Sequence, residues 1–442
     1  MTAAAPATPA DGDRAVSPLR WWALALSALA IFTSYYESDV IGPIADLLGR
    51  QRAFTQSQIG DLNAIISLPN VALALFIGLM IDRFGATRVT VWAALIGFVG
   101  AVLTAIGEPY ALMWCGRLVF GVSEGAIFIA LIAGLASWFP RSGIAVATAL
   151  FLSFARVGSF SLDMSPTWAR TLYQSGWQAP LWLGAALTAA GLAAAFALRV
   201  LDLRRSGRPA APTRASEPIR WSEVWTFDLS YWYICGLHVL YAAVFFPFRQ
   251  TYAIEYLQHA KGLTLEQASQ ANAGVFFAAI FATPLFGLLA DRIGHRALLL
   301  VVGTVLLPVT LLILGATHLH PWFSTVLMGI SWSMVPAVIW PSTALIVEPR
   351  RLGTALGVIT LLQALGLWGS NRIAGWLADL SAAGADHPEG YVTMLWFFGI
   401  VSVLALTSAL LLWRREVGPY GHGLERADLA RTPRRKSAAE AA

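Results

Sequence analysis

Long apolar stretches of roughly 20 residues alternate with short polar segments along most of this chain. A helix needs about 20 apolar residues to cross the hydrocarbon core of a bilayer. Twelve stretches satisfy this, and they cover residues 21–43, 58–81, 89–107, 110–138, 142–164, 177–200, 228–254, 266–290, 296–316, 321–347, 352–380 and 391–413. The pattern therefore predicts an all-α membrane protein with twelve transmembrane helices.

Polar segments divide these stretches into two groups of six. Residues 201–222 are rich in arginine and proline and read as a flexible linker between an N-terminal bundle, 21–200, and a C-terminal bundle, 223–413. The polar segments 1–20 and 414–442 read as tails. No short apolar region with a cleavage site precedes residue 21, so we interpret the first stretch as an uncleaved span.

The composition agrees with a lipid environment. The chain is 57% hydrophobic and only 12% charged, whereas soluble domains carry about 25% charged residues. Its two cysteines, Cys115 and Cys235, both lie in apolar stretches and do not suggest a disulfide framework or a metal cluster. Much of the surface is therefore expected to face lipid, with no cofactor or metal.

The basic residues predict the orientation. With both termini inside, 22 of the 30 lysines and arginines fall on cytoplasmic segments, as the positive-inside rule requires. These charges are spread over short membrane-edge segments, which disfavours nucleic-acid binding and favours contact with anionic lipid headgroups. The chain is rich in arginine and has lysine only at 261 and 436, which is typical of a GC-rich bacterial genome. We expect a bacterial inner-membrane protein with both termini in the cytoplasm.

An internal repeat relates the two halves. The string Gly78–Gly85 returns 209 residues later as Gly287–Gly294, each time between two apolar stretches. A repeat of this length in a membrane chain indicates a transporter built from two similar bundles.

The repeated string also supplies candidates for conformational gating. Its first glycine allows close approach of a neighbouring helix, and its aspartate can accept hydrogen bonds at a helix N-terminus. The predicted gating residues are Gly78, Asp82, Arg83, Gly287, Asp291, Arg292 and, in the fourth span, Arg117.

The duplicated G-x-x-x-D-R-x-G string and the R-x-x-x-G pattern at 117–121 resemble the major facilitator superfamily. The resemblance implies two pseudo-symmetric six-helix bundles, alternating access to a central site, and a monomer. Shorter strings are similar to a subfamily of lysosomal dipeptide transporters within that superfamily. They are Ser137–Phe139, Ala155–Ser159, Phe246–Phe248, Trp340–Pro341 and Leu352–Ala355. This likeness implies dipeptides or other short peptides as substrates.

Charged residues inside the apolar stretches point to the site, because each costs roughly 2.5–3.5 kcal/mol at a helix centre. Arg156 offers a fixed fork of donors for a carboxylate, whereas Glu124 or Asp39 can hold an ammonium group. The predicted substrate-binding residues are Arg156, Glu124, Asp39, Tyr35, Tyr36, His238, Tyr241, Phe245, Trp340, Gln363 and Asn371. Opposite charges at two ends of one cavity suit a zwitterion.

Several alternatives stay open at this point. Arg249 can instead reach the headgroups, Asp163 can be solvated, and His238 can be a satisfied core histidine. The acids Glu124 and Asp39 can also take up protons, which suits a proton-linked carrier of organic anions or drugs. The chain has no P-loop, H-E-x-x-H or G-x-S-x-G motif, so neither an enzyme nor an ATP-driven pump is expected.

Overall fold

The computed structural model describes residues 18–140, 143–205, 221–348 and 350–426, and every regular element in these ranges is helical. The first half contains six long helices. They are α1 (Leu19–Ser38), α3 (Gln56–Phe84), α4 (Ala86–Ile106), α5 (Tyr110–Trp138), α6 (Ile144–Asp163) and α9 (Gln178–Arg205). Four short helices connect them: η1 (Gly42–Ile44), α2 (Ala45–Arg52), α7 (Ser165–Trp168) and α8 (Arg170–Gln174).

The second half repeats this order. Its long helices are α10 (Leu229–Pro247), α12 (Leu265–Ile293), α13 (Arg296–Ala316), α14 (Pro321–Ile346), α15 (Leu352–Leu380) and α16 (Tyr391–Val417). Helix α10 continues through a π-helical turn, η3 (Phe248–Tyr252), into α11 (Ala253–Lys261). The short helices η2 (Trp221–Thr226) and η4 (Pro388–Gly390) precede α10 and α16.

The predicted spans are confirmed as helices with small shifts at their ends. Ten helical segments in the described ranges are long and apolar enough to cross a membrane. Helices α1 and α3 complete the set of twelve long helices. The first span ends at Ser38 rather than 43, whereas α9 and α16 continue to Arg205 and Val417. The two tails up to residue 17 and from 427, and linker residues 206–220, lie outside the described residues.

Helix starts extend the repeat beyond the Gly-Asp-Arg string. Thr55 caps α3 and Thr264 caps α12, each in a reciprocal capping box with the glutamine three residues later. Such a box satisfies two backbone N–H groups that the first helical turn leaves free. The two threonines are 209 residues apart, the same period as the repeat.

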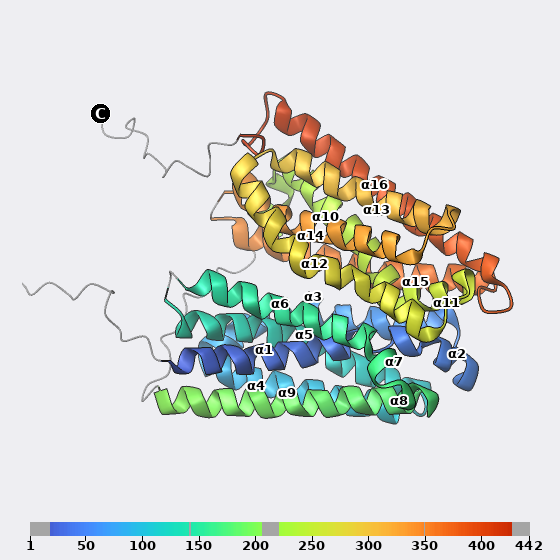
Figure 1. Cartoon of the computed structure of the whole chain (residues 1–442). Coiled ribbons are helices and arrows are strands. Elements are labelled where there is room, and N and C mark those ends of the chain that lie inside the picture. The colour runs from blue at the N-terminus through green and yellow to red at the C-terminus, as the bar shows by residue number, and fades with distance from the viewer. Residues whose placement is uncertain (1–17, 141–142, 206–220, 349, 427–442) are drawn as a thin grey trace, which may run out of the picture.

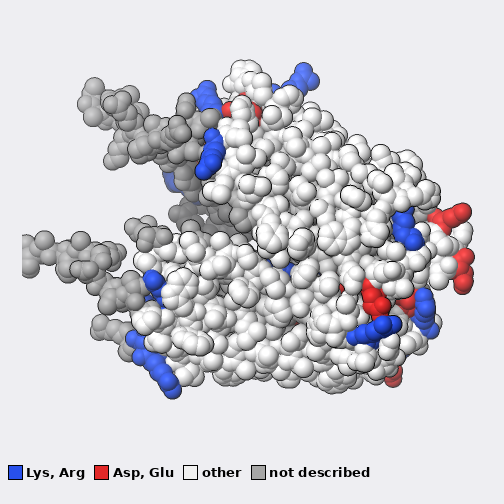
Figure 2. Space-filling model, in the orientation of Figure 1, with Lys and Arg blue, Asp and Glu red and all other residues white. Residues whose placement is uncertain are grey.

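The two halves lie side by side and diverge toward one end (Figure 1). We call the end where α1 begins and α9 and α16 finish the terminal end, and the opposite end, with α2, α8 and α11, the distal end. The surfaces part at the terminal end and meet at the distal end (Figure 2). Charged side chains gather at both ends and leave an uncharged belt between them, as a membrane-spanning protein requires.

Helix α3 of the first half packs against α15 of the second, and α6 packs against α12. Two glycines allow the first contact. A Cβ at Gly60 would stand 2.7 Å from the carbonyl oxygen of Asn371, and one at Gly375 would stand 2.6 Å from that of Gln56. Backbones this close leave no room for a side chain. The halves are therefore held together near the distal end.

Candidate functional site

Arg156, in the second half of α6, lies where the two halves face each other. Its guanidinium carbon is 6.0 Å from the ring centroid of Tyr35 on α1 and 5.5 Å from those of Phe276 on α12 and Trp332 on α14. Within the described part of the chain, this guanidinium has no hydrogen bond or ion pair. A half-buried cation surrounded by aromatic faces, with all its donors free, suits an anionic ligand.

Glu124 on α5 supplies the opposite charge. The hydroxyl of Ser38 donates to its Oε1 at 2.7 Å, whereas Oε2 accepts no hydrogen bond from the described residues. The Tyr35 hydroxyl lies close enough to interact electrostatically with both Arg156 and Glu124. The structure therefore brings Arg156, Tyr35 and Glu124 near one another, with a charge of each sign in the neighbourhood of the tyrosine.

Aromatic residues of the second half form the facing wall. Phe245 stacks on Trp332 with 4.2 Å between ring centroids and 9° between planes. Tyr241 stacks beyond them, and its hydroxyl lies 2.7 Å from Ser331 Oγ. The rings thus form a rigid layer that ends at Arg156.

His238 and Gln363 form a polar pair on the same side. His238 Nε2 lies 3.0 Å from Gln363 Oε1, and the imidazole packs edge-on against Trp340 at 5.1 Å. Trp340 is 39% exposed, so its other edge is free. These three predicted site residues lie together.

Arg117 has a structural role at the end of α1. Its guanidinium donates to the carbonyl oxygens of Glu37 at 2.8 Å and Ser38 at 2.6 Å, in the last turn of the helix. It also donates to the Leu62 carbonyl and to Asn63 Oδ1 on α3. The fully buried arginine thereby fixes Ser38, which holds Glu124.

A buried ion-pair cluster joins the halves on the distal side of Arg156. Arg249, in the π-helical turn of the second half, donates to Asp39 after α1 and to Asp163 at the end of α6. Gln250 also donates to Asp39, at 2.6 Å, and Asn272 of α12 donates to Asp163, at 3.1 Å. We call Arg249, Asp39 and Asp163 the distal lock.

The contacts of the distal lock answer two questions that the sequence left open, the surroundings of Arg249 and those of Asp163. Arg249 is 1% exposed and paired, so it does not reach toward headgroups. Asp163 is paired as well and is 2% exposed rather than solvated. Asp39, predicted to bind substrate, has both carboxylate oxygens engaged by the second half.

A second cluster lies nearer the distal surface. His259 of α11 donates from Nε2 to Asp46 Oδ1 of α2 at 2.9 Å, and its Nδ1 lies 2.9 Å from the Tyr391 hydroxyl. Burial by itself raises the pKa of Asp46, but the hydrogen bond from His259 and the charge of Arg50 outweigh it and hold that pKa below its ordinary value. Glu255 accepts from Tyr391 and from Gln56 of the first half, which extends the contact.

Other predicted site residues lie apart from Arg156. Tyr36 is 1% exposed and packs in the core of the first half, because it follows Tyr35 and points to another side of α1. Asn371 accepts from Thr251 and, through its carbonyl, from Tyr252. It belongs to the α3–α15 contact at the distal end.

The predicted gating residues of the repeat lie at the terminal end. The side chains of Arg83 and Arg292 are exposed, and a Cβ at Gly287 would meet no atom within 4 Å. The expected close approach at Gly287 is therefore not made where the halves stand apart. The side chain of Asp291 lies outside the described residues. The gating roles of Gly78, Asp82 and their repeats stay predictions.

Phe276 lies between the guanidinium groups of Arg156 and Arg249, and sequence reasoning did not single it out. Its ring centroid lies 5.5 Å from the guanidinium of Arg156 and 4.1 Å from that of Arg249. The ring is 1% exposed, and as one of many apolar residues in its span it carries no distinguishing pattern. Arg249 of the distal lock and Arg156 thus share one aromatic neighbour.

Comparisons with known proteins give a consistent result. A sequence profile described as Major Facilitator Superfamily matches residues 27–252 and 234–439. The chain is 29% identical over 424 residues to the lysosomal dipeptide transporter MFSD1 of Homo sapiens, covering 93% of this chain and 89% of that protein. It is 25% identical over 294 residues to the probable sulfoacetate transporter SauU of Cupriavidus necator, covering 62% of this chain and 65% of the relative.

A solved structure shares the fold. A bacterial homologue of the human lysosomal transporter Spinster, in an inward-facing and occupied conformation, superposes with a TM-score of 0.72 at 16% identity. The match covers 90% of this chain and 97% of that structure. At this identity the likeness concerns the arrangement of the helices.

Proposed function

The chain belongs to the Major Facilitator Superfamily, and from this membership we propose that it carries short peptides, by alternating access, across a bacterial inner membrane. It is a multi-pass membrane transporter rather than an enzyme. Its similarity to a dipeptide transporter over most of both chains supports the proposed substrate class.

The observation that carries the proposal is the unpaired guanidinium of Arg156 among three aromatic rings. Arginine binds a carboxylate through two parallel hydrogen bonds, and no carboxylate of the described residues forms an ion pair with Arg156. Glu124 also lies near Tyr35, and one of its carboxylate oxygens accepts no hydrogen bond from the described residues. The C-terminal carboxylate of a peptide goes to Arg156 and its ammonium group to Glu124.

The distal lock provides the gate. With both termini in the cytoplasm, the terminal end faces inward, and the halves part on that side (Figure 2). The lock and the α3–α15 contact close the opposite side. Transport then requires Arg249 to separate from Asp39 and Asp163 while the terminal ends approach, which engages the gating residues of the repeat.

Uptake into proteoliposomes tests the substrate class with three related compounds: dialanine, N-acetyl-dialanine and dialanine amide. We expect uptake of dialanine only. Arg156→Gln removes charge-assisted hydrogen bonds of about 1.5–3 kcal/mol and should lower the apparent affinity for dialanine roughly 10- to 100-fold. Arg170→Gln, which alters an exposed arginine, serves as the control and should transport normally.

The capped compounds distinguish the proposal from a carrier of organic anions. The probable sulfoacetate transporter among the relatives motivates that second function, because Arg156 alone suits any carboxylate or sulfonate. Such a carrier would accept N-acetyl-dialanine as readily as dialanine. Equal uptake of both compounds, or full activity of Arg156→Gln, would refute the peptide assignment.

A further inference from the structure

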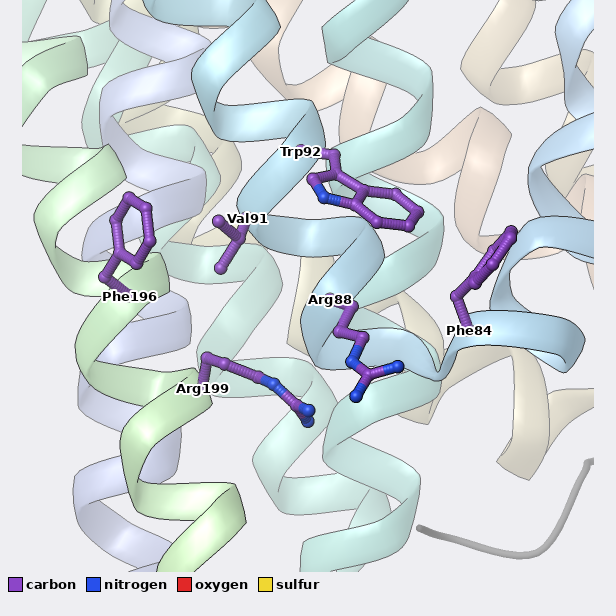
Figure 3. Close-up of a pocket in the computed structure, with 6 residues that line it drawn as sticks. All are labelled: Phe84, Arg88, Val91, Trp92, Phe196 and Arg199. Carbon is purple, nitrogen blue, oxygen red and sulfur yellow. The ribbon is translucent and has the colours of Figure 1, made fainter.

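A groove of about 410 Å³ opens on the outer surface of the first half, away from the second half. It lies between α4 and α9 near the terminal end, where residue Phe84 also contributes from the end of α3. Arg88 and Arg199 lie in its lower part in Figure 3, with Trp92, Val91 and Phe196 above them. Two cations thus adjoin an apolar strip at a membrane edge.

The two arginines differ in their partners. Arg199 donates to Thr87 Oγ1 at 3.0 Å and lies 3.4 Å from Asp202 Oδ2, so its position is fixed. Arg88 is exposed and has no hydrogen bond or ion pair within the ranges that the structure describes. Counting Asp202, the groove keeps one net positive charge, and the donors of Arg88 are free.

The apolar strip faces lipid. Trp92 is 38% exposed and Phe196 is 51% exposed on the outside of the bundle. Aromatic side chains at this depth sit where acyl chains meet headgroups. A ligand for this groove therefore needs a negative group beside the arginines and a hydrocarbon tail along the helices.

The second half carries a groove of the same design. It lies between α10 and α16 at the terminal end, with Arg414, Arg415, Tyr233 and Tyr420 in its lining. Arg415 is fixed by Asp228 at 2.8 Å, whereas Arg414 is exposed and unpaired within the described ranges. A fixed arginine, a free arginine and aromatic rings thus occur together twice at one membrane edge.

We propose that the α4–α9 groove binds an anionic phospholipid of the inner leaflet, with its phosphate between Arg88 and Arg199 and an acyl chain along Trp92 and Phe196. Basic grooves between helices on the cytoplasmic side suit anionic headgroups. A phosphate diester accepts hydrogen bonds from both guanidinium groups at once. The occupant is a phospholipid rather than free phosphate, because the apolar strip is continuous with the arginines.

Native mass spectrometry of the purified full chain tests this with phosphatidylglycerol and phosphatidylcholine. We expect retained phosphatidylglycerol on the parent, and an affinity about fivefold lower for Arg88→Gln, which corresponds to about 1 kcal/mol at 1.4 kcal/mol per tenfold change. Arg204→Gln removes a charge from the same end of α9 outside the groove and should bind as the parent does. Arg88→Lys should bind more tightly than Arg88→Gln.

Three results would overturn the proposal. One is an equal loss in Arg88→Gln and Arg204→Gln, which would indicate general attraction to a basic surface. Another is equal retention of phosphatidylcholine by the parent. The third is thermal stabilisation by inorganic phosphate that matches stabilisation by phosphatidylglycerol, because the acyl chain would then contribute nothing. A Trp92→Ala variant with weakened lipid binding and unchanged phosphate response would support the acyl contact.

Discussion

Three arginines within the membrane-spanning helices, two buried and one half-buried, have different roles that depend on their partners. Arg117 satisfies backbone carbonyls at the end of α1 and has every donor group engaged inside one half. Arg249 pairs with two carboxylates of the other half. Arg156 has no partner in the described chain and keeps its donors for a ligand. The same residue type thus serves as brace, lock and binding group.

Replacement of the brace should reduce stability. Arg117→Lys keeps the charge but loses the planar fork, so the Ser38 carbonyl at the end of α1 and Asn63 Oδ1 on α3 lose their donors. We expect a melting temperature lowered by about 5 °C or more in detergent, because one or two such losses cost several kcal/mol. Arg83→Lys, at an exposed arginine, is the control and should melt with the parent. Equal melting of both variants would contradict the role of Arg117.

Phe276 should affect substrate affinity although its own side chain has no polar group. Phe276→Leu removes the shared aromatic face from Arg156, which is worth about 0.5–2 kcal/mol for a cation near a ring. The apparent affinity for dialanine should fall several-fold. The neighbouring Phe277 is 46% exposed at the bundle surface, so Phe277→Leu is a matched control. A similar change in both variants would show that the effect is packing in α12 and not contact with the arginine.

The sequence identified the charged candidates but could not assign their roles. Membrane burial is costly for any charge, which singles out Arg156, Glu124, Asp39 and Arg249 alike. Roles depend on partners, and the partner of Asp39 is 210 residues away in the chain. Tyr35 and Tyr36 are adjacent, and their side chains point about 100° apart around the helix. This rotation places Tyr35 beside Arg156 and Tyr36 in the core of the first half.

At the scale of elements, the distal lock depends on how spans one and seven are interrupted. Helix α1 ends at Ser38 and α10 passes into a π-helical turn at Phe248, so both spans change their winding near the same depth. The π-turn adds a residue to one turn and changes the direction of Arg249 relative to Tyr241 and Phe245. Residues four apart share one face of a regular helix, so the spacing of Tyr241, Phe245 and Arg249 predicts one common stripe and could not show this change.

Replacement of Arg249, the cation of the distal lock, should open the distal end. Arg249→Gln leaves Asp39 and Asp163 facing each other without the guanidinium, and breaking a buried ion pair costs about 3–5 kcal/mol. We expect the separation of spin labels on α2 and α11 to shift toward longer distances. Arg170→Gln breaks a pair between the halves that is largely exposed, worth about 0–1 kcal/mol, and should leave the distances unchanged. Unaltered distances in Arg249→Gln would contradict the lock.

At the scale of the whole molecule, the arrangement of helices was predictable and the conformation was not. Apolar stretches and a 209-residue repeat sufficed for two bundles of six, because each stretch must be helical in lipid. The opening at the terminal end arises from the relative tilt of the halves, while contacts inside each half can persist as they rock. No local pattern in the sequence indicates whether the two halves part at the terminal end or at the distal end.

Acid should weaken closure of the distal end. The pKa of Asp46 is lowered in the closed arrangement and returns toward its ordinary value of about 3.9 once His259 moves away. Its contribution to closure is therefore complete above that ordinary value and is lost as the pH falls through the lowered pKa. We expect label distances between α2 and α11 to begin to lengthen as the pH falls below the ordinary value of an aspartate, about 3.9, and to lengthen further as the pH passes the lowered pKa of Asp46.

Asp46→Asn provides the control for this pH response. It removes the titrating carboxylate, so the distal end should be looser at neutral pH and should change less on acidification. Glu255, whose Oε1 lies 3.8 Å from His259 Nδ1, and Tyr391, whose hydroxyl lies 2.9 Å from the same nitrogen, remain around His259 in this variant. An unchanged acid response in Asp46→Asn would assign the effect to another of these groups.

Asp39 and Arg249 are 210 residues apart, whereas the period of the duplication is 209 residues. The repeat counterpart of Asp39 is therefore Phe248, and that of Arg249 is Val40, so each charge of the pair belongs to one half alone. Both apolar counterparts are buried. An ion pair that closes this end thus depends on the differences between the two halves and not on what the duplication gave to both.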